Sequence, residues 1–317
     1  MSQTNQKIAI VIPAYKVGGH ICNVLNAVPS GIDHVIVVDD ACPEGSGKVV
    51  EKNSFEQIES LVVLYHQKNR GVGGAVVTGY KKALELGCDV VVKIDGDGQM
   101  DLDQIPAIVR PLMLNKADYV KGNRFVDFKA LRSMPKLRLI GNSVLSFTLK
   151  VVSGNWHIMD PTNGYTAINA LALKRINLDE ISKRYFFESD MLINLNIHKC
   201  VVRYVPMAAF YGDEESSLSV RKVLFQFPFY LLRGFIKRIV LKYFIYDFNM
   251  ASIYILFGFP MLIWGILFGA YEWWLHATAG TITPTGTVML SVLPLILGTQ
   301  LILQAITIDI NSIPKKE

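Results

Sequence analysis

Short apolar runs of strand length alternate with helical stretches over residues 7–125 of the chain. The runs are apolar almost throughout rather than at every second position, which is typical of strands buried on both faces. An alternating order of strand and helix favours a mostly parallel sheet covered by helices on both faces, so we expect an α/β fold. The expected strands are 8–13, 35–38, 61–66, 90–94 and 119–121, and the expected helices lie near 20–28, 49–58, 72–86 and 102–115.

The pattern changes near the C-terminus, where residues 251–271 and 286–308 carry no charge over 21 and 23 positions. At ~1.5 Å per residue, either run is long enough as a helix to cross the ~30 Å hydrocarbon core of a bilayer. The alternative is a pair of buried core helices, but uncharged runs longer than about 18 residues are rare in soluble cores. We therefore expect two transmembrane helices.

The segment between these runs, 272–285, has no Lys or Arg and contains Trp273 and Trp274, which suit a membrane interface. The positive-inside rule places such a loop outside, with both termini and the polar body in the cytoplasm. Because Met1–Lys7 is polar, no cleaved signal is expected. The expected protein is an integral, multi-pass membrane protein.

Charge is unevenly distributed, since only six of the 59 Lys, Arg, Asp and Glu residues follow residue 246. Residues 221–246 carry six basic side chains and no acid, interleaved with aromatic and aliphatic ones. Such a stretch beside a span is typical of amphipathic interfacial helices on anionic lipid. Nucleic-acid binding is not expected beside a membrane span, and a plain solvated basic face is the remaining alternative. The expected segments are 1–220, 221–246 and 247–317.

Acidic residues gather where two expected strands end. Asp39 and Asp40 follow 35–38, and Asp95-Gly96-Asp97-Gly98-Gln99 follows 90–94. Ligands of such sheets bind beyond the carboxyl ends of the strands. Neighbouring carboxylates repel unless a cation lies between them, and oxygen ligands suit Mg²⁺ or Mn²⁺ bridged to a diphosphate. The loop therefore predicts a divalent cation and a nucleotide-diphosphate donor, against the alternative of a solvated turn.

A glycine-rich segment, Asn69–Ala75, opens the third expected helix and is the one feature of the sequence that could support a different class, a nicotinamide-binding Rossmann oxidoreductase. Its spacing does not fit G-x-G-x-x-G/A, because Val76 stands three residues after Gly73. It also follows the third strand rather than the first. A helix N-terminus that helps to neutralise phosphate remains compatible with the segment. The four scattered cysteines form no C-x-x-C pair, which argues against a zinc site and a disulfide framework.

Six short motifs follow one another along the chain: Ile10–Tyr15, Val37–Ala41, Asn69–Gly71, Asp95–Gln99, Gly122–Arg124 and Asp160–Tyr165. As an ordered set they resemble the family 2 inverting glycosyltransferases of GT-A (Rossmann-like) fold, over about residues 7–225. The closest branch is the polyprenyl-phosphate glycosyltransferases, such as dolichyl-phosphate mannosyltransferase and the bactoprenol glucosyltransferases, and the latter also resemble this chain in having two C-terminal spans.

The resemblance implies roles for individual residues. Nucleobase and ribose are expected against Pro13, Ala14, Tyr15 and Asp40. Asp95 is also expected to bind the nucleotide sugar, and the metal with its diphosphate is expected against Asp95, Asp97 and Gln99. Arg124 is similar to the arginine that meets donor or acceptor phosphate, and Asp160 matches the family's Asp-Pro-Thr motif. The expected catalytic residues are Asp97, Asp160 and Arg124. Because Tyr211–Leu218 departs from the family's basic stretch, the candidates for holding the acceptor phosphate are Arg124, Lys136, Arg138 and Arg221.

The expected reaction is inverting transfer of a hexose, with UDP-glucose favoured, to polyprenyl phosphate at the cytoplasmic face. A lipid phosphate is largely ionised at pH 7 and needs no general base. The alternative is a polysaccharide synthase with a sugar-hydroxyl acceptor, for which Asp160, Glu188 or Asp190 would serve as base. Expected partners are the nucleotide sugar, polyprenyl phosphate and anionic lipid but no nucleic acid, and a homo-oligomer is left open.

Overall fold

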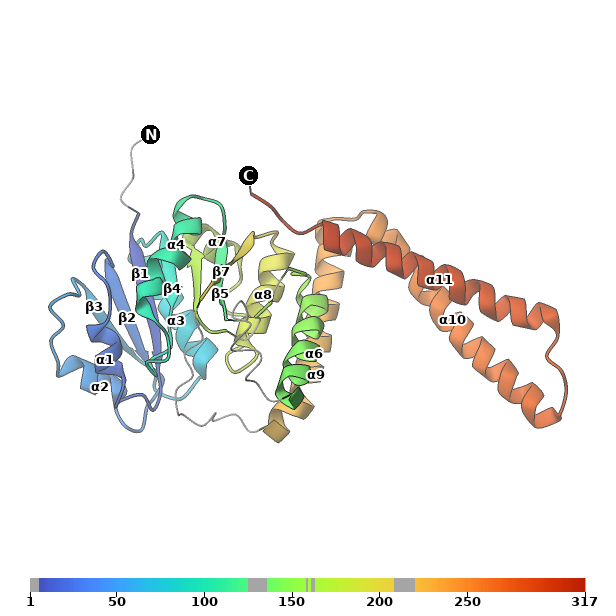
Figure 1. Cartoon of the computed structure of the whole chain (residues 1–317), viewed down its shortest axis with the longest axis horizontal. Helices are drawn as coiled ribbons and strands as arrows, with labels where there is room; N and C mark the ends of the chain where they lie inside the picture. Colours follow the sequence, from blue (N-terminus) through green and yellow to red (C-terminus); the bar gives the residue numbers. More distant parts are fainter. Residues whose placement is uncertain (1–5, 125–135, 158, 161–162, 208–219, 317) are drawn as a thin grey trace. The chain divides into compact units, whose positions relative to one another are not determined.

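The structure is a computed structural model that describes residues 6–124, 136–157, 159–160, 163–207 and 220–316, apart from the side chains of 136–140, 142 and 220–225 (Figure 1). The chain forms two compact units. The sheet unit contains Met1–Phe235 together with Pro314–Glu317, and the hairpin unit contains Ile236–Ile313.

In the part of the chain that the structure describes, the sheet unit is built on seven strands in the order β3-β2-β1-β4-β6-β5-β7. Only β6 runs antiparallel to its neighbours, β4 and β5, while the other pairs are parallel. The expected mostly parallel sheet is confirmed. The strands are β1 (Ile8–Ala14), β2 (His34–Asp39), β3 (Leu61–Tyr65), β4 (Val90–Lys93), β5 (Tyr119–Asn123), β6 (Thr166–Asn169) and β7 (Val202–Pro206).

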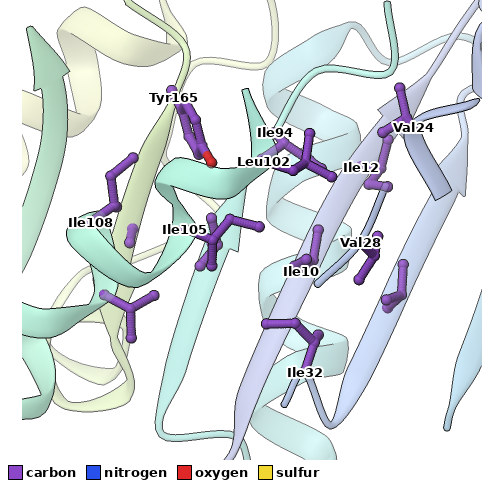
Figure 2. Close-up of a cluster of buried hydrophobic side chains, with 14 of the residues drawn as sticks. Ile10, Ile12, Val24, Val28, Ile32, Ile94, Leu102, Ile105, Ile108 and Tyr165 are labelled. Atoms are coloured by element: carbon purple, nitrogen blue, oxygen red, sulfur yellow. The ribbon is translucent and has the colours of Figure 1, made fainter. Parts of the chain in front are cut away.

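Helices cover both faces of this sheet because alternate strand residues point into two separate apolar cores. Ile10 and Ile12 of β1 face a core shared with α1 (Ile21–Asn26), α2 (Ser46–Glu51), the 3₁₀ turn η1 (Leu102–Gln104) and α4 (Ile105–Met113). Figure 2 shows part of this core, with Val24 of α1, Leu102 of η1 and Ile105 of α4. Ala9 and Val11 face the other core, with α3 (Val72–Glu85), α7 (Ala170–Arg175) and α8 (Phe187–Ile197). Each fully buried Ile or Val contributes ~1.5–3 kcal/mol, so the two cores fix the sheet.

Two further helices pack beside α8. α6 (Lys136–Ser153) contacts α8 directly. α9 (Val220–Ile239) packs against the start of α8, where the Phe186 ring meets Phe227 and Tyr230 at 5.4 and 5.6 Å between centroids. A Cβ on Gly234 of α9 would lie 2.6 Å from the Ile193 side chain, so this contact is close.

One expected helix differs in its position, because α2 covers Ser46–Glu51 rather than 49–58. The reason is a contact that the residue pattern does not show. The buried Asp39 carboxylate accepts hydrogen bonds from the amides of Cys42 and Gly47, both at 2.7 Å. The second bond satisfies an amide in the first turn of α2, and so fixes the start of that helix near the end of β2.

The hairpin unit consists of the end of α9, a π-helical turn (Val240–Tyr246, η2), and the long helices α10 (Met250–Ala279) and α11 (Thr285–Asn311) (Figure 1). Both long helices are apolar enough to cross a membrane, and only 11% and 6% of their most apolar windows are buried. A core helix of a soluble protein would be mostly buried, so the low burial favours a membrane environment.

The connection between the long helices is shorter than expected. α10 continues through Trp273 and Trp274 and ends at Gly280, which adopts a left-handed φ of +66°. The expectation that 272–279 forms a loop is therefore wrong. These residues include no proline or glycine that would stop a helix, whereas Gly280 takes the left-handed conformation that often terminates one.

Glycines let α10 and α11 approach closely. A Cβ on Gly298 would lie 2.7 Å from the Leu262 amide nitrogen and 2.8 Å from the Gly258 carbonyl oxygen. Ser291 donates a hydrogen bond of 2.9 Å to the Gly265 carbonyl across the same interface. Small residues and such hydrogen bonds are the usual means by which membrane helices pack.

A buried ionic cluster lies where α11 ends within the hairpin unit. The Asp309 carboxylate accepts from Arg238 (2.8 Å), Lys242 (3.0 Å) and the Tyr243 hydroxyl (2.5 Å). All four side chains are buried. The sequence pattern places Arg238 and Lys242 on a lipid-facing basic surface, and this is wrong for these two cations, because they neutralise an acid 67 or more residues later in the chain.

Candidate functional site

A polar pocket of about 160 Å³ lies at the carboxyl end of β4 and brings together four of the expected site residues, Asp95, Asp97, Gln99 and Arg124. The rest of its lining comes from the segments that follow β4 and precede β6, and from Met207 after β7. A larger pocket of about 350 Å³ lies along α3. Its lysines Lys81 and Lys82 are paired with Asp179 and Glu85, so we assign the chemistry to the pocket at β4.

The acidic loop Asp95–Gln99 has a defined geometry. Asp97 Oδ1 accepts the Gln99 amide at 3.0 Å, and Gly98 between them has a φ of +77°, which favours glycine. Asp95 Oδ1 lies 2.6 Å from Lys93 Nζ. The loop thus presents Asp97 and Gln99 to the pocket, while one oxygen of Asp95 is already held by a lysine.

These residues fit a divalent cation that is shared with a substrate. Among the described residues, no three His, Cys, Asp or Glu side chains cluster closely enough to form a complete metal cage. Mg²⁺ in proteins is usually held by one or two carboxylates together with substrate phosphates, and Asp95, Asp97 and the Gln99 amide oxygen supply that kind of donor set. The expected metal residues therefore lie together in the pocket.

Arg124 and Asp160 form a two-point ion pair at the pocket wall. Arg124 Nε and one terminal nitrogen lie 2.8 and 3.1 Å from the two Asp160 oxygens, and the Arg124 amide donates to Asp160 as well. Asp160 is fully buried, whereas Arg124 is 30% exposed and lines the pocket. Asp160 therefore does not face the pocket itself. It holds the Arg124 guanidinium in a fixed orientation toward the pocket.

The three acids considered as general bases differ in their surroundings. Both oxygens of Asp160 face Arg124. Buried Asp190 accepts the Ser182 amide at 2.8 Å and the Asn194 side chain at 3.0 Å, which makes it part of the α8 packing. Glu188 lies 3.7 Å from Lys93 Nζ. Asp160 and Asp190 are therefore engaged by the protein itself, which does not favour either of them as a general base, whereas Glu188 forms a longer ion pair and is 18% exposed.

Two buried lysines lie behind the pocket, and the sequence motifs do not include either. Lys93 ends β4 and Lys121 lies in β5, and both are essentially unexposed. Burial lowers the pKa of Lys121 to about 8. Burial also acts to lower the pKa of Lys93, but the nearby Asp95 and Glu188 outweigh it and raise that pKa. A single lysine in an otherwise apolar strand is the signal that could have revealed them.

Asp40 has an unexpected set of partners. Its oxygens accept from the His66 ring (2.6 Å) and from the amides of Arg70 (2.8 Å) and Gly71 (2.7 Å), and the side chain is buried. Gly71 has a φ of +84°, and a Cβ there would lie 2.5 Å from the Lys183 carbonyl. The Asn69–Gly71 turn is therefore clamped by Asp40, and direct contact of Asp40 with a nucleotide stays a prediction.

The remaining expected site residues are dispersed. Ala14 is buried in the core, and its carbonyl accepts the Asp40 amide at 3.0 Å, whereas Pro13 is partly exposed and Tyr15 is exposed. None of these three lines the pocket at β4 as the structure describes it. Lys136 and Arg138 fall in the first turn of α6, and Arg221 in the first turn of α9, and the side chains of these residues lie outside the described part of the chain.

Comparison with known proteins defines the class. The model of glycosyl transferase family 2 matches residues 9–176, and the chain belongs to that family. It is therefore a glycosyltransferase, and the oxidoreductase alternative is wrong. The match includes β1 to β6, the acidic loop, Arg124 and Asp160.

Matches to individual proteins are more specific than the match to the family model. The chain is 32% identical to the UDP-N-acetylglucosamine–dolichyl-phosphate N-acetylglucosaminyltransferase of Methanococcus voltae, over 65% of this chain and 86% of that protein. It is 35% identical to the undecaprenyl-phosphate mannosyltransferase of Micrococcus luteus, over 52% and 66%.

Among solved structures, the fold is similar to glucosyl-3-phosphoglycerate synthase from Mycobacterium tuberculosis. That protein was crystallised with Mn²⁺, UDP-glucose and phosphoglyceric acid. The TM-score is 0.54 at 16% identity, covering 74% of this chain and 79% of that one. At this identity the likeness shows the fold alone.

Proposed function

We propose that the protein transfers a sugar from a nucleotide-diphosphate sugar to a polyprenyl phosphate, with inversion at the anomeric carbon. The observation that carries the proposal is the meeting of the acidic loop and Arg124 in one pocket, in a chain that also has two helices able to cross a membrane. Relatives named for dolichyl-phosphate and undecaprenyl-phosphate acceptors support the choice of acceptor.

The acceptor determines what the protein must do. A phosphate monoester has its second pKa near ~6, so its oxygen is a nucleophile at pH 7 without losing a proton to a base. In the proposed step this oxygen attacks the anomeric carbon from the face opposite the diphosphate. The bond from that carbon to the diphosphate oxygen breaks, and its electron pair leaves with the nucleoside diphosphate. Inversion follows from this in-line geometry.

The side chains of the pocket supply charge and orientation. Arg124, fixed by Asp160, would hold a phosphate of donor or acceptor. Asp95, Asp97 and Gln99 would hold Mg²⁺ or Mn²⁺, whose charge would offset the charge that grows on the leaving diphosphate. Lys136, Arg138 and Arg221 are the proposed further contacts for the acceptor phosphate, and Pro13, Ala14, Tyr15 and Asp40 for the nucleoside.

We further propose that residues 1–220 form the catalytic domain on the cytoplasmic face, with 221–246 at the interface and 247–317 as a transmembrane hairpin. Both termini would then be cytoplasmic. The resemblance to bactoprenol glucosyltransferases favours UDP-glucose, whereas the named relatives are transferases of N-acetylglucosamine and mannose. The product would be a glycolipid precursor for the cell envelope.

The test is a screen of UDP- and GDP-sugars with the purified full chain, polyprenyl phosphate, and Mg²⁺ or Mn²⁺, with glycolipid formation as the readout. We expect transfer from one nucleotide sugar. This transfer should stop when EDTA is added, and it should not occur when the non-phosphorylated prenol replaces polyprenyl phosphate. Comparable transfer to the free prenol or to a sugar acceptor would overturn the proposal and favour a polysaccharide synthase.

A further inference from the structure

The two buried lysines behind the pocket occupy one row of the sheet. Lys93 of β4 and Lys121 of β5 are both paired in register with Thr166 of the intervening β6. The next row with side chains on the same face of the sheet consists of Val91, Ile168 and Tyr119, which belong to the apolar core against α3 and α8. The lysines therefore form the boundary between this core and the pocket.

Each lysine holds a different residue of the pocket wall. Lys93 Nζ contacts Asp95 Oδ1 at 2.6 Å, and Lys121 Nζ donates to the main-chain carbonyl of Asn163. Asp95 and Asn163 both line the pocket. Between them, a Cβ on Gly164 would lie 2.6 Å from Asp95 Oδ2 and from Lys93 Nζ, so the wall is closely packed around the lysine.

The lysines also set the charge of the pocket. The described charged groups around it are the carboxylates of Asp95, Asp97, Asp101, Asp160 and Glu188 and the cations of Lys93, Lys121 and Arg124. Without the lysines, the acids would exceed the cations by four rather than by two. A diphosphate adds further negative charge, and close charges in a poorly solvated site repel strongly.

A purely structural role explains this arrangement poorly. Burying an ammonium group is costly, and apolar side chains usually fill such positions at least as well. Two such groups directly beneath a pocket for an anionic ligand indicate that their charge is used there. Lys93 and Lys121 touch wall residues rather than the open pocket, so their action on a ligand is indirect.

We propose that Lys93 and Lys121 are positioning residues for the diphosphate end of the donor. They fix Asp95 and Asn163, and they supply the positive charge beneath the pocket that allows it to accept a nucleoside diphosphate with its cation. The inference rests on the proposed function for the identity of the ligand and concerns donor binding only.

The experiment measures binding of UDP and of GDP with Mn²⁺ to the purified full chain by calorimetry. We expect Lys93→Met and Lys121→Met each to weaken binding of the preferred nucleotide at least tenfold. The KM for the donor should rise in step, while the KM for polyprenyl phosphate changes less than twofold. The matched control is Lys81→Met, an exposed lysine of α3 paired with Asp179, which should bind like the wild type.

A second variant tests the charge without removing a buried cation. Glu188→Gln keeps the shape of the side chain and removes one negative charge 3.7 Å from Lys93 Nζ, so nucleotide binding should tighten about threefold. This variant keeps the inference testable if the lysine variants do not fold. Unchanged binding in Glu188→Gln, or wild-type binding in a folded Lys93→Met and Lys121→Met, would overturn the inference.

The binding arm also separates this inference from the proposed function. A wild type that binds nucleotide but glycosylates no polyprenyl phosphate would contradict the proposed acceptor, and the variants would still decide the role of the lysines. A wild type that binds neither UDP nor GDP would overturn the inference itself.

Discussion

At the scale of single residues, the site depends on which acids are already paired by the protein. One oxygen of Asp95 contacts Lys93, and both oxygens of Asp160 face Arg124. Asp97 lines the pocket beside Gln99 and receives that residue's amide at one oxygen. We propose that Asp97 is the principal metal-binding carboxylate because it lines the pocket beside Gln99, with Asp95 held in a supporting position by Lys93.

The first prediction is that Asp97→Asn abolishes metal-dependent transfer, with a loss of at least about a hundredfold in turnover. The substitution removes a charged oxygen ligand and hardly changes the volume, so the melting temperature should stay close to that of the wild type. Turnover across a Mn²⁺ titration provides the measurement. Near-normal turnover in a folded variant would refute the assignment of the metal site.

The second prediction concerns the pair of Arg124 and Asp160. Asp160→Asn leaves a partly buried guanidinium without its counter-charge, which should lower the free energy of unfolding by about 3 kcal/mol and reduce transfer. Thermal melting and initial rates measure the two effects. Asp179→Asn, in an exposed pair with Lys81, is the control and should change neither. Full activity in Asp160→Asn would show that Arg124 needs no positioning.

Residue-level prediction from sequence succeeded where a motif and a strand end coincide. The acidic loop follows an apolar strand, so its place at the edge of the sheet could be inferred, and Asp97, Gln99 and Arg124 do meet in one pocket. The partners of Asp40 and Lys93 could not be inferred. The partners of Asp40 lie in a loop that follows 26 or more residues later in the chain. The partner of Lys93 is only two residues away, but their contact depends on the side-chain conformations just after β4 ends.

At the scale of elements, the pattern identified strands that contain a continuous apolar run, such as β1, β2 and β4. It did not identify β6 and β7. β6 has only four residues, two of them polar, and β7 is only partly buried, so neither has a continuous apolar run. The start of α2 was also missed, because the side chain of Asp39, rather than a residue next to the helix, satisfies its first turn.

The third prediction tests the packing of the hairpin. Gly298→Ala places a Cβ within 3 Å of backbone atoms of α10, which cannot move aside as a flexible side chain would. Overpacking of this kind costs ~1–3 kcal/mol, so the melting temperature in detergent should fall. Gly286→Ala is the matched control in the same helix, since nothing lies within 4 Å of its added Cβ, and it should not destabilise. Equal melting of the two variants would contradict the observed helix contact.

At the scale of the whole molecule, the chain leaves the sheet unit after residue 235 and returns to it at Pro314. Lys316 contacts Asp118 at 2.6 Å and Asn115 at 3.0 Å, both in the sheet unit. If α10 and α11 both cross the membrane, the chain comes back to the side from which it left. This agrees with the expected placement of both termini on one side, which stays a prediction.

The basic stretch of residues 221–246 separates into cations with different surroundings. Arg238 and Lys242 are buried against Asp309, whereas Arg233 is exposed and Lys237 is partly exposed. Sequence alone could not separate them, because Asp309 lies 67 residues beyond Lys242, near the end of the second apolar helix. Among the described cations of this stretch, Arg233 and Lys237 are therefore the two whose exposure lets them meet an anionic lipid surface.

The last prediction uses this separation. Each cation near an anionic bilayer contributes roughly 1 kcal/mol, so Arg233→Gln combined with Lys237→Gln should raise the apparent KM for polyprenyl phosphate by roughly thirtyfold in anionic bilayers. In neutral bilayers the double variant and the wild type should differ little, and nucleotide binding should be unchanged because the acidic loop is untouched.

The control is the buried pair of cations. Arg238→Met combined with Lys242→Met should instead lower the melting temperature, since Asp309 is left buried without a counter-charge. Kinetics in bilayers of both compositions, together with melting curves, distinguish the two pairs. Full lipid activity of the first double variant in anionic bilayers would show that the exposed cations serve only as a solvated face, and loss of its nucleotide binding would show that they support the catalytic unit rather than its contact with lipid.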